Sequence, residues 1–107
     1  MQSDKTFQAL SLCRRAGKLV MGFDAVAESV LKGKAFLVLT AADLSPKTQK
    51  RISGLCEGLT ELYGLPLTQL ELCQITRKPV GVYSVTDENL AVLCKNSLTQ
   101  TKEDTRV

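Results

Sequence analysis

Histidine and tryptophan are both missing from this chain of 107 residues, and aromatic residues make up only 5% of it. Without histidine, no imidazole can serve as a general base, a member of a catalytic triad or a metal ligand. The few aromatic residues are also too sparse for a surface on which single-stranded nucleic acid stacks base by base. The composition therefore argues against histidine-based enzymes and against a stacking platform.

Long hydrophobic runs are missing as well. The longest unbroken apolar run covers residues 35–39, far short of the ~20 residues that a membrane-spanning helix needs. The first twenty residues carry five charged side chains and no apolar stretch typical of a secretory signal. We therefore expect a cytoplasmic protein with no membrane partner.

The four cysteines are Cys13, Cys56, Cys73 and Cys94, and no two of them have the C-x-x-C spacing of a zinc site. Each follows a leucine, and free cysteine packs as a small hydrophobic residue. We expect reduced thiols, with Cys13, Cys56 and Cys94 buried on the inner faces of helices. A disulfide or a nucleophile is the alternative interpretation. The sequence predicts no metal and no cofactor.

Composition and charge indicate one globular domain. Hydrophobic residues make up 44% of the chain and charged residues 23%, which is ordinary for a folded domain. We assign residues 1–98 to this domain and expect the polar tail, residues 99–107, to fray. The net charge is +3, and residues 1–34 by themselves sum to +3. A basic first third fits a nucleic-acid surface, but from charge alone the solvated surface of a mildly basic protein is the favoured interpretation.

The pattern of apolar residues predicts helices that alternate with short strands. Continuous apolarity over residues 36–39 is typical of a strand covered on both faces. Ser45 and Pro46 form a strong helix start, and we expect that helix to end at Gly64 and Pro66. The first half of the chain is expected to contain a helix from Asp4 to Gly17, an extended piece at 18–20 and a helix from Gly22 to Gly33. The second half is expected to contain a strand at 66–68, a short helix at 69–75 and a strand at 80–85. A last helix, capped by Thr86 or Asp87, is expected to turn Leu90, Leu93 and Cys94 inward.

This alternation predicts an α/β fold, a three-layer α/β/α sandwich with a roughly four-stranded mixed sheet. A doubly wound nucleotide-binding fold is the usual alternative. It is disfavoured because the chain has neither G-x-G-x-x-G nor the phosphate-binding G-x-x-x-x-G-K-[ST] motif. Nor does any set of residues form a catalytic constellation, so we expect a protein that is not an enzyme.

Three places have the charge expected of a phosphate site. The first is the helix start at Gly22, which follows Arg14, Arg15 and Lys18 and would offer unpaired backbone N–H groups. A tight turn beside solvated basic residues explains it equally well.

The second place is the helix start at Ser45, whose Lys47, Lys50 and Arg51 are better explained as the exposed face of an amphipathic helix. The third is the basic loop Thr76-Arg77-Lys78-Pro79, which is a weak signal when taken alone.

Several segments resemble the kink-turn-binding ribosomal protein family, which includes the large-subunit proteins L-seven-Ae and L-thirty-e. The segments that carry the resemblance are residues 12–22 (LCRRAGKLVMG), 34–39 (KAFLVL) and 42–48 (ADLSPKT), with shorter matches at 64–67, 71–72 and 85–87. The resemblance covers roughly residues 6–95. It implies the same sandwich fold and RNA binding by two adjoining parts, the glycine-led start of the second helix and the loop at residues 76–80.

The implied RNA-contacting set is Lys18, Gly22, Phe23, Asp24, Ala25, Glu28, Lys34, Thr76, Arg77, Lys78, Pro79 and Val80. Within it, phosphate contact is expected from Lys18, the Gly22 turn, Lys34, Arg77 and Lys78, and base reading from Asp24. The family has Asn, Glu and Lys where this chain has Asp24, Ala25 and Glu28. Asp24 can accept a hydrogen bond but cannot donate as an amide does, and each lost base contact costs about 1–3 kcal/mol.

The resemblance therefore implies a non-catalytic, ribosomal-protein-like RNA-binding protein of the translation apparatus. Its expected partner is rRNA or another structured, kink-turn-like RNA, with the ribosome as a further candidate. The alternative is a protein-interaction module that kept the fold and lost kink-turn binding, which the residues at positions 25 and 28 favour.

Overall fold

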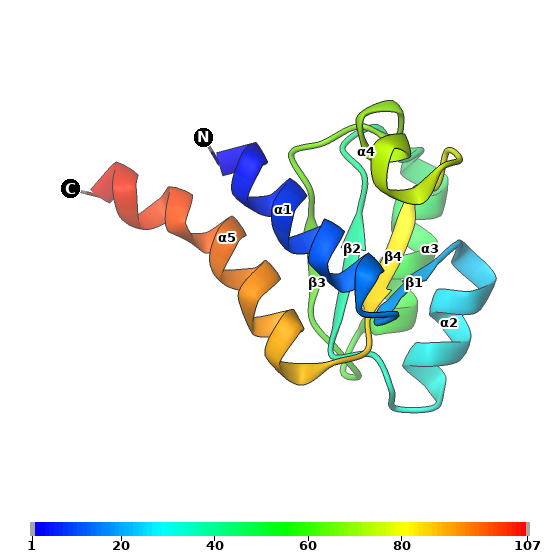
Figure 1. The fold of residues 1–107 in the computed structure, drawn as a ribbon. Coiled ribbons are helices and arrows are strands. Elements are labelled where there is room, and N and C mark those ends of the chain that lie inside the picture. The colour runs from blue at the N-terminus through cyan, green and yellow to red at the C-terminus, as the bar shows by residue number, and fades with distance from the viewer. Residues whose placement is uncertain (1, 107) are drawn as a thin grey trace.

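The computed structural model describes the backbone of residues 2–106 and the side chains of residues 4–98. Helices and strands alternate along this part of the chain (Figure 1). In order they are α1 (Gln2–Arg15), β1 (Leu19–Met21), α2 (Phe23–Leu31), β2 (Leu37–Thr40), α3 (Pro46–Cys56), β3 (Leu62–Gly64), α4 (Gln69–Thr76), β4 (Val82–Val85) and α5 (Glu88–Arg106). No helix of the described part is both long and apolar enough to cross a bilayer.

The strands form one mixed sheet in the order β1-β4-β2-β3. β4 runs antiparallel to both of its neighbours, while β3 runs parallel to β2. All four residues of β2 are buried, as the continuous apolar run predicts. Helices α1, α4 and α5 cover one face of the sheet, and α2 and α3 cover the other. The predicted three-layer α/β/α sandwich with a four-stranded mixed sheet is confirmed.

Alternate residues of the two central strands supply the two cores. Leu39 and Tyr83 join the cluster beneath α1, α4 and α5, whereas Val38 and Val82 join the cluster beneath α2 and α3. This division follows from the two-residue period of a strand, which points successive side chains to opposite faces. Both faces of the sheet are therefore closed by packed side chains, and the exposed elements around its edges are left for binding.

The cysteines lie where their apolar neighbours predict. Cys13, Cys56 and Cys94 are buried, Cys73 is half-buried, and all four are free thiols. The sulfur atoms of Cys13 and Cys94 approach to 3.6 Å across the contact between α1 and α5. The predicted burial on inner helix faces is thus confirmed.

The third strand differs from the sequence prediction. It covers residues 62–64, not 66–68, and α3 ends at Cys56 well before Gly64. The helix stops early because Gly58 takes a left-handed conformation (φ +76°), which is the usual way for glycine to end a helix. Pro66 could not serve the sheet, because it has no N–H to donate to a ladder.

The last helix differs from the sequence prediction in the orientation of one leucine and in its length. Leu93 is 43% exposed, so the prediction that it points inward is wrong, while Cys94 beside it is buried as predicted. The helix backbone continues to Arg106, through the segment expected to form a frayed tail. The side chains of that segment lie outside the described residues, and its fraying stays a prediction.

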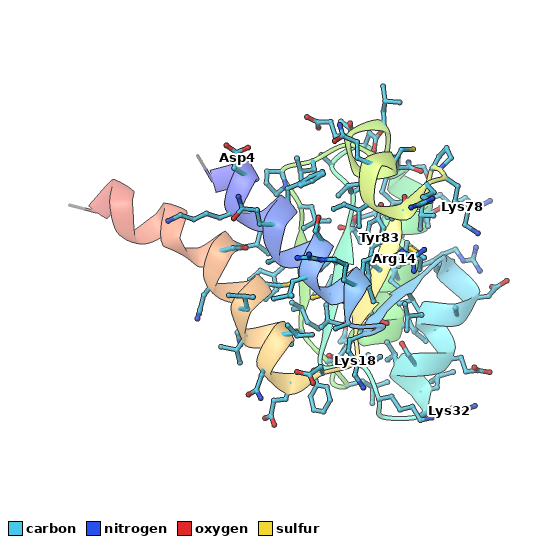
Figure 2. The ribbon with its side chains drawn as sticks, viewed as in Figure 1. Asp4, Arg14, Lys18, Lys32, Lys78 and Tyr83 are labelled. Atoms are coloured by element: carbon cyan, nitrogen blue, oxygen red, sulfur yellow. The ribbon has the colours of Figure 1, made fainter. Side chains whose placement is uncertain are left out.

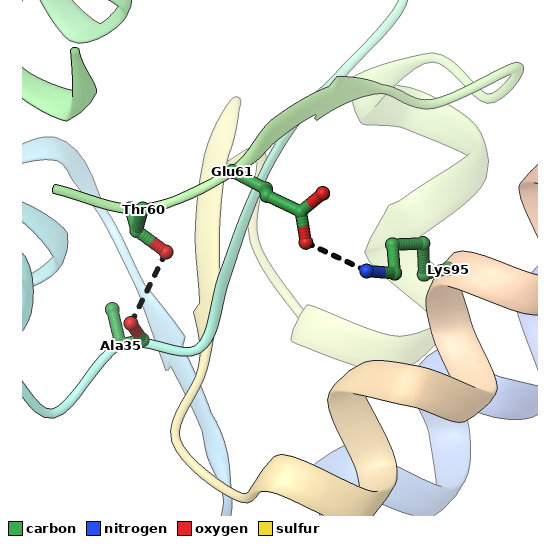
Figure 3. A network of polar contacts seen from close by, with 4 residues as sticks. All are labelled: Ala35, Thr60, Glu61 and Lys95. Carbon is green, nitrogen blue, oxygen red and sulfur yellow. Dashed lines mark hydrogen bonds and ion pairs between the residues drawn. The ribbon is translucent and has the colours of Figure 1, made fainter. Parts of the chain in front are cut away.

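A polar contact ties the edge strand to the last helix (Figure 3). Lys95 Nζ on α5 lies 2.7 Å from Glu61 Oε1, just before β3, and the hydrogen bond to Glu61 raises the pKa of Lys95. Next to it, Thr60 Oγ1 donates to the carbonyl of Ala35. The charge of Lys95 is therefore already balanced by a carboxylate.

Candidate nucleic-acid interface

The start of α2 is an uncapped helix N-terminus. Gly22 occupies the N-cap position at φ 99° and ψ 146°, and no side chain caps the helix. The first intrahelical bond runs from Val26 N–H to the Gly22 carbonyl. Among the described residues, the backbone N–H groups of Phe23, Asp24 and Ala25 have no hydrogen-bond acceptor. Such free donors, together with the positive end of the helix dipole, attract anions.

In the loop between α4 and β4, the middle residues are exposed and the residues at the two ends are buried. Thr76 and Val80 are buried, whereas Arg77, Lys78 and Pro79 are exposed. Thr76 Oγ1 donates to the Lys78 carbonyl at 2.6 Å and also contacts the Leu72 carbonyl at 3.2 Å. The side chains of Thr76 and Val80 therefore hold the loop in shape, and only residues 77–79 are available for contact.

The α2 start and this loop lie at the same end of the sheet (Figure 1). Met21 pairs with Tyr83 across β1 and β4, and Gly22 N–H donates to the Val82 carbonyl at 2.9 Å. The loop leads directly into Val82, so the two segments meet although more than fifty residues separate them in sequence. The adjacency that the resemblance implied is present.

Lys18 and Lys34 do not lie at this place. The antiparallel register puts Lys18 at the other end of β1, where its carbonyl accepts from Thr86 N–H. Lys34 precedes Phe36, whose N–H bonds to Val85 at that same far end. Figure 2 shows Lys18 well separated from Lys78. The expectation that both lysines belong to one surface with the loop is therefore corrected, because β1 separates Lys18 from Gly22 and α2 separates Lys34 from it.

Two carboxylates are close to the α2 start. Asp24 and Glu28 are both exposed, and Glu28 Oε1 lies 3.7 Å from Lys32 Nζ one turn later. Ala25 is exposed between them and offers no polar side-chain atom. An i,i+4 pair at the surface stabilises a helix by only about 0.3–0.5 kcal/mol. Lys32 therefore offsets part of the Glu28 charge but leaves a negative group beside the free N–H groups.

Arg51 joins this surface, although its sequence pattern suggested only a solvated helix face. The side chain is exposed, and its guanidinium carbon lies 4.5 Å from the centre of the Phe23 ring. This is cation–π geometry, and it places a fixed positive charge beside the first residue of α2. The contact depends on how α2 packs against α3 around Val26 and Ile52, and no local sequence signal carries that information.

Arg77 has an unusual backbone. It is the one non-glycine residue of the described chain with a positive φ, 69°, and it caps the end of α4 by donating its N–H to the Cys73 carbonyl at 2.7 Å. This position usually holds glycine, and a left-handed conformation costs other residues roughly 1–2 kcal/mol. A charged side chain has thus been placed where glycine would be more stable, which is a common feature of functional positions.

No metal site is evident at this surface. Within the described residues, no group of three or more cysteine, aspartate or glutamate side chains is arranged to hold a metal ion. The groups available for binding a ligand are the free backbone N–H donors and the exposed cations Arg51, Arg77 and Lys78. Asp24 adds a hydrogen-bond acceptor.

Comparison with known proteins places the chain in a family. A model of the ribosomal protein L7Ae/L30e/S12e/Gadd45 family matches residues 4–102. The RNA-binding protein YlxQ of Bacillus subtilis is 30% identical over 96 residues, which cover 85% of this chain and 92% of that protein. YlxQ of Enterococcus faecium is 29% identical over 91 residues, covering 81% and 84%.

Solved structures agree on the fold. A Bacillus halodurans protein of unknown function superposes with a TM-score of 0.81 at 22% identity, over 88% of this chain and 96% of its own. The Giardia lamblia 15.5kD RNA binding protein superposes with a TM-score of 0.76 at 18% identity, over 95% and 88%. The family match, which spans most of the domain, and the agreement in architecture lead to one conclusion: the chain belongs to the ribosomal protein L7Ae/L30e/S12e/Gadd45 family.

Proposed function

We propose that this protein binds structured RNA of the kink-turn type and catalyses no reaction. The observation that carries the proposal is the hydrogen bond of Gly22 to Val82, which sets an uncapped helix N-terminus beside an exposed basic loop. Family membership and the relatives named as RNA-binding proteins support it. We further propose that the RNA is rRNA or another structured RNA of the translation apparatus, and that the protein acts in the cytoplasm.

Each part of the surface has a distinct task in this proposal. The free N–H groups at the start of α2 donate hydrogen bonds to a phosphate oxygen. Arg77 and Lys78 contribute attraction for the backbone that does not depend on sequence. Asp24 accepts from a guanine N–H, and Arg51, held over Phe23, neutralises a phosphate at the rim of α2. Shape and backbone contacts then supply most of the affinity, as is usual for duplex RNA.

The side chains on α2 predict modest affinity. Ala25 cannot make a hydrogen bond to a base, and Glu28 adds negative charge near the phosphate path. Each missing base contact costs about 1–3 kcal/mol of discrimination. We therefore expect this chain to distinguish a kink-turn from a plain duplex less sharply than a relative with polar or basic residues at these positions.

A protein-interaction module is the second candidate function. Leu12 and Leu93 are 40% and 43% exposed and line one groove between α1 and α5, and large exposed apolar side chains are common at protein contacts. In this alternative, the α2 surface is a remnant of RNA binding.

A binding titration at two salt concentrations separates the candidates. A labelled kink-turn RNA is titrated at about 50 mM and 200 mM salt, with a plain duplex of the same length as control. The proposal predicts tighter binding of the kink-turn and an affinity that falls steeply with salt, since each neutralised phosphate contributes a slope of about −0.7 to −0.9. Absence of binding to either RNA at low salt would favour the protein-interaction module.

A further inference from the structure

A basic groove lies beside the surface at the α2 start and shares Arg77 with it, between the ends of α1 and α4. The cavity is about 370 Å³ in volume, which suits a small ligand group. It is lined by Ser11, Arg14, Arg15, Gln74, Ile75 and Arg77.

The three arginines of this groove have no acidic partner. Arg14, Arg15 and Arg77 are exposed, and within residues 4–98 no carboxylate pairs with any of them. Two helix C-termini also lie here, since Arg14 and Arg15 are in the last turn of α1 and Arg77 caps α4. Each helix end contributes a charge of only about −0.5, so roughly two of the three positive charges remain uncompensated.

The groove is continuous with the α2 surface. Arg77 lines the groove, Lys78 follows it in the exposed loop, and the loop leads to Val82, which bonds to Gly22. Arg14 lies on the side of the molecule that also carries Lys78 (Figure 2). The groove and the start of α2 thus lie on either side of one short loop.

We propose that the groove is a second RNA subsite, which binds the phosphodiester backbone of the strand that leaves the α2 surface. Guanidinium groups match phosphate oxygens with paired N–H donors, and Ser11 and Gln74 add neutral donors. Among the residues whose side chains are described, no carboxylate lines the groove to oppose a phosphate. The inference rests on the proposed function, because it assigns a further part of the same RNA to this chain.

The test compares two RNAs of different reach. One kink-turn RNA ends close to its internal loop, and the other has each stem extended by one helical turn. The variant Arg14→Gln/Arg15→Gln is compared with Lys18→Gln/Lys34→Gln, which removes the same charge at the far end of the sheet. Circular dichroism and thermal melting confirm that both variants are folded.

The inference predicts that the arginine variant binds the long RNA about tenfold more weakly, with a salt slope smaller by about 1.5–2. Binding of the short RNA, and all binding by the lysine variant, should change little. Equal losses in the two variants, or equal losses with a DNA duplex of the same length, would overturn the RNA subsite and leave the α2 surface intact. Failure of the unmodified protein to bind either RNA would overturn the proposed function, and the subsite with it.

Discussion

Gly22 has a backbone conformation that favours glycine, and no atoms crowd the position where a side chain would begin. Its φ of +99° is rarely accessible to other residues, yet a Cβ placed there would meet no atom within 4 Å. The glycine is therefore required for the turn that starts α2, and no described residue outside the turn fills the space beside it. A substitution there acts through strain in the turn and not through a clash.

Gly22→Ala should lower the free energy of unfolding by about 1–3 kcal/mol, because alanine must adopt a strained conformation. It should also weaken RNA binding, since the free N–H groups that follow would move. Gly54→Ala is the matched control: Gly54 lies within α3 with open space around it, so alanine there should raise stability by about 0.5–1 kcal/mol. Urea unfolding measures both changes, and equal effects would contradict the role given to Gly22.

The arginine at position 77 should lower the stability of the protein and raise its affinity for RNA. Arg77→Gly removes the cost of a left-handed arginine, roughly 1–2 kcal/mol, but adds chain entropy worth about 0.5–1 kcal/mol. We expect the variant to be more stable by about 0.5–1 kcal/mol in urea unfolding and weaker in RNA binding. Arg77→Lys, which keeps the charge and the strain, should retain most of the affinity. A glycine variant that loses stability would show that the left-handed turn is not strained.

At the scale of the element, α2 carries the acidic side chains that limit affinity. Ala25→Glu with Glu28→Lys restores the types of residue that the family resemblance implies. It adds a hydrogen-bonding side chain at position 25 and replaces the negative charge at position 28 with a positive one. We expect kink-turn binding to tighten by one to two orders of magnitude, about 1.4–2.8 kcal/mol. Stability should change little, because the pair of Glu28 with Lys32 is exposed. A folded double variant with no gain in a binding titration would mean that this surface is not the RNA site.

Elements with a strong local signal could be predicted from sequence, and contacts between elements could not. The apolar run at residues 36–39 predicted β2, and Ser45 with Pro46 predicted the start of α3, because burial on both faces and helix capping are local requirements. The strand at 62–64 was missed because the left-handed turn at Gly58 was not recognised, which let the predicted helix run on.

For the candidate site, too, local segments could be predicted from the sequence, but contacts between elements could not. The glycine-led start of α2 and the basic loop were found through short motifs. The separation of Lys18 from that loop depends on the register of β1 with β4, and the contact of Arg51 with Phe23 depends on helix packing. Neither arrangement leaves a trace in the local sequence, so the charge pattern identified the basic residues but not how they group.

At the scale of the whole molecule, the thiols report how tightly the core is packed. Burial raises the pKa of Cys56, and the hydrogen bond to Cys13, together with burial, raises that of Cys94. Because thiolate is the reactive form, Cys56 and Cys94 should be inert at neutral pH. The hydrogen bond with Cys94 lowers the pKa of Cys13, but Cys13 is fully buried, so a reagent cannot reach it in the folded protein. A thiol-reagent titration should modify only Cys73, which is half-buried, in native buffer and all four in denaturant. Fewer than four thiols in denaturant would reveal a disulfide and contradict the account.

The most direct test of the central claim is to map the RNA contact by NMR. Amide resonances of the ¹⁵N-labelled protein are followed as a kink-turn RNA is added, with a plain duplex as control. The account predicts that the largest shifts fall on residues 23–25, where the N–H groups are free, and on Arg77 and Lys78, with smaller ones at Arg14 and Arg15. Shifts concentrated on the exposed face of α5, or at the far end of the sheet around Lys18, would contradict it.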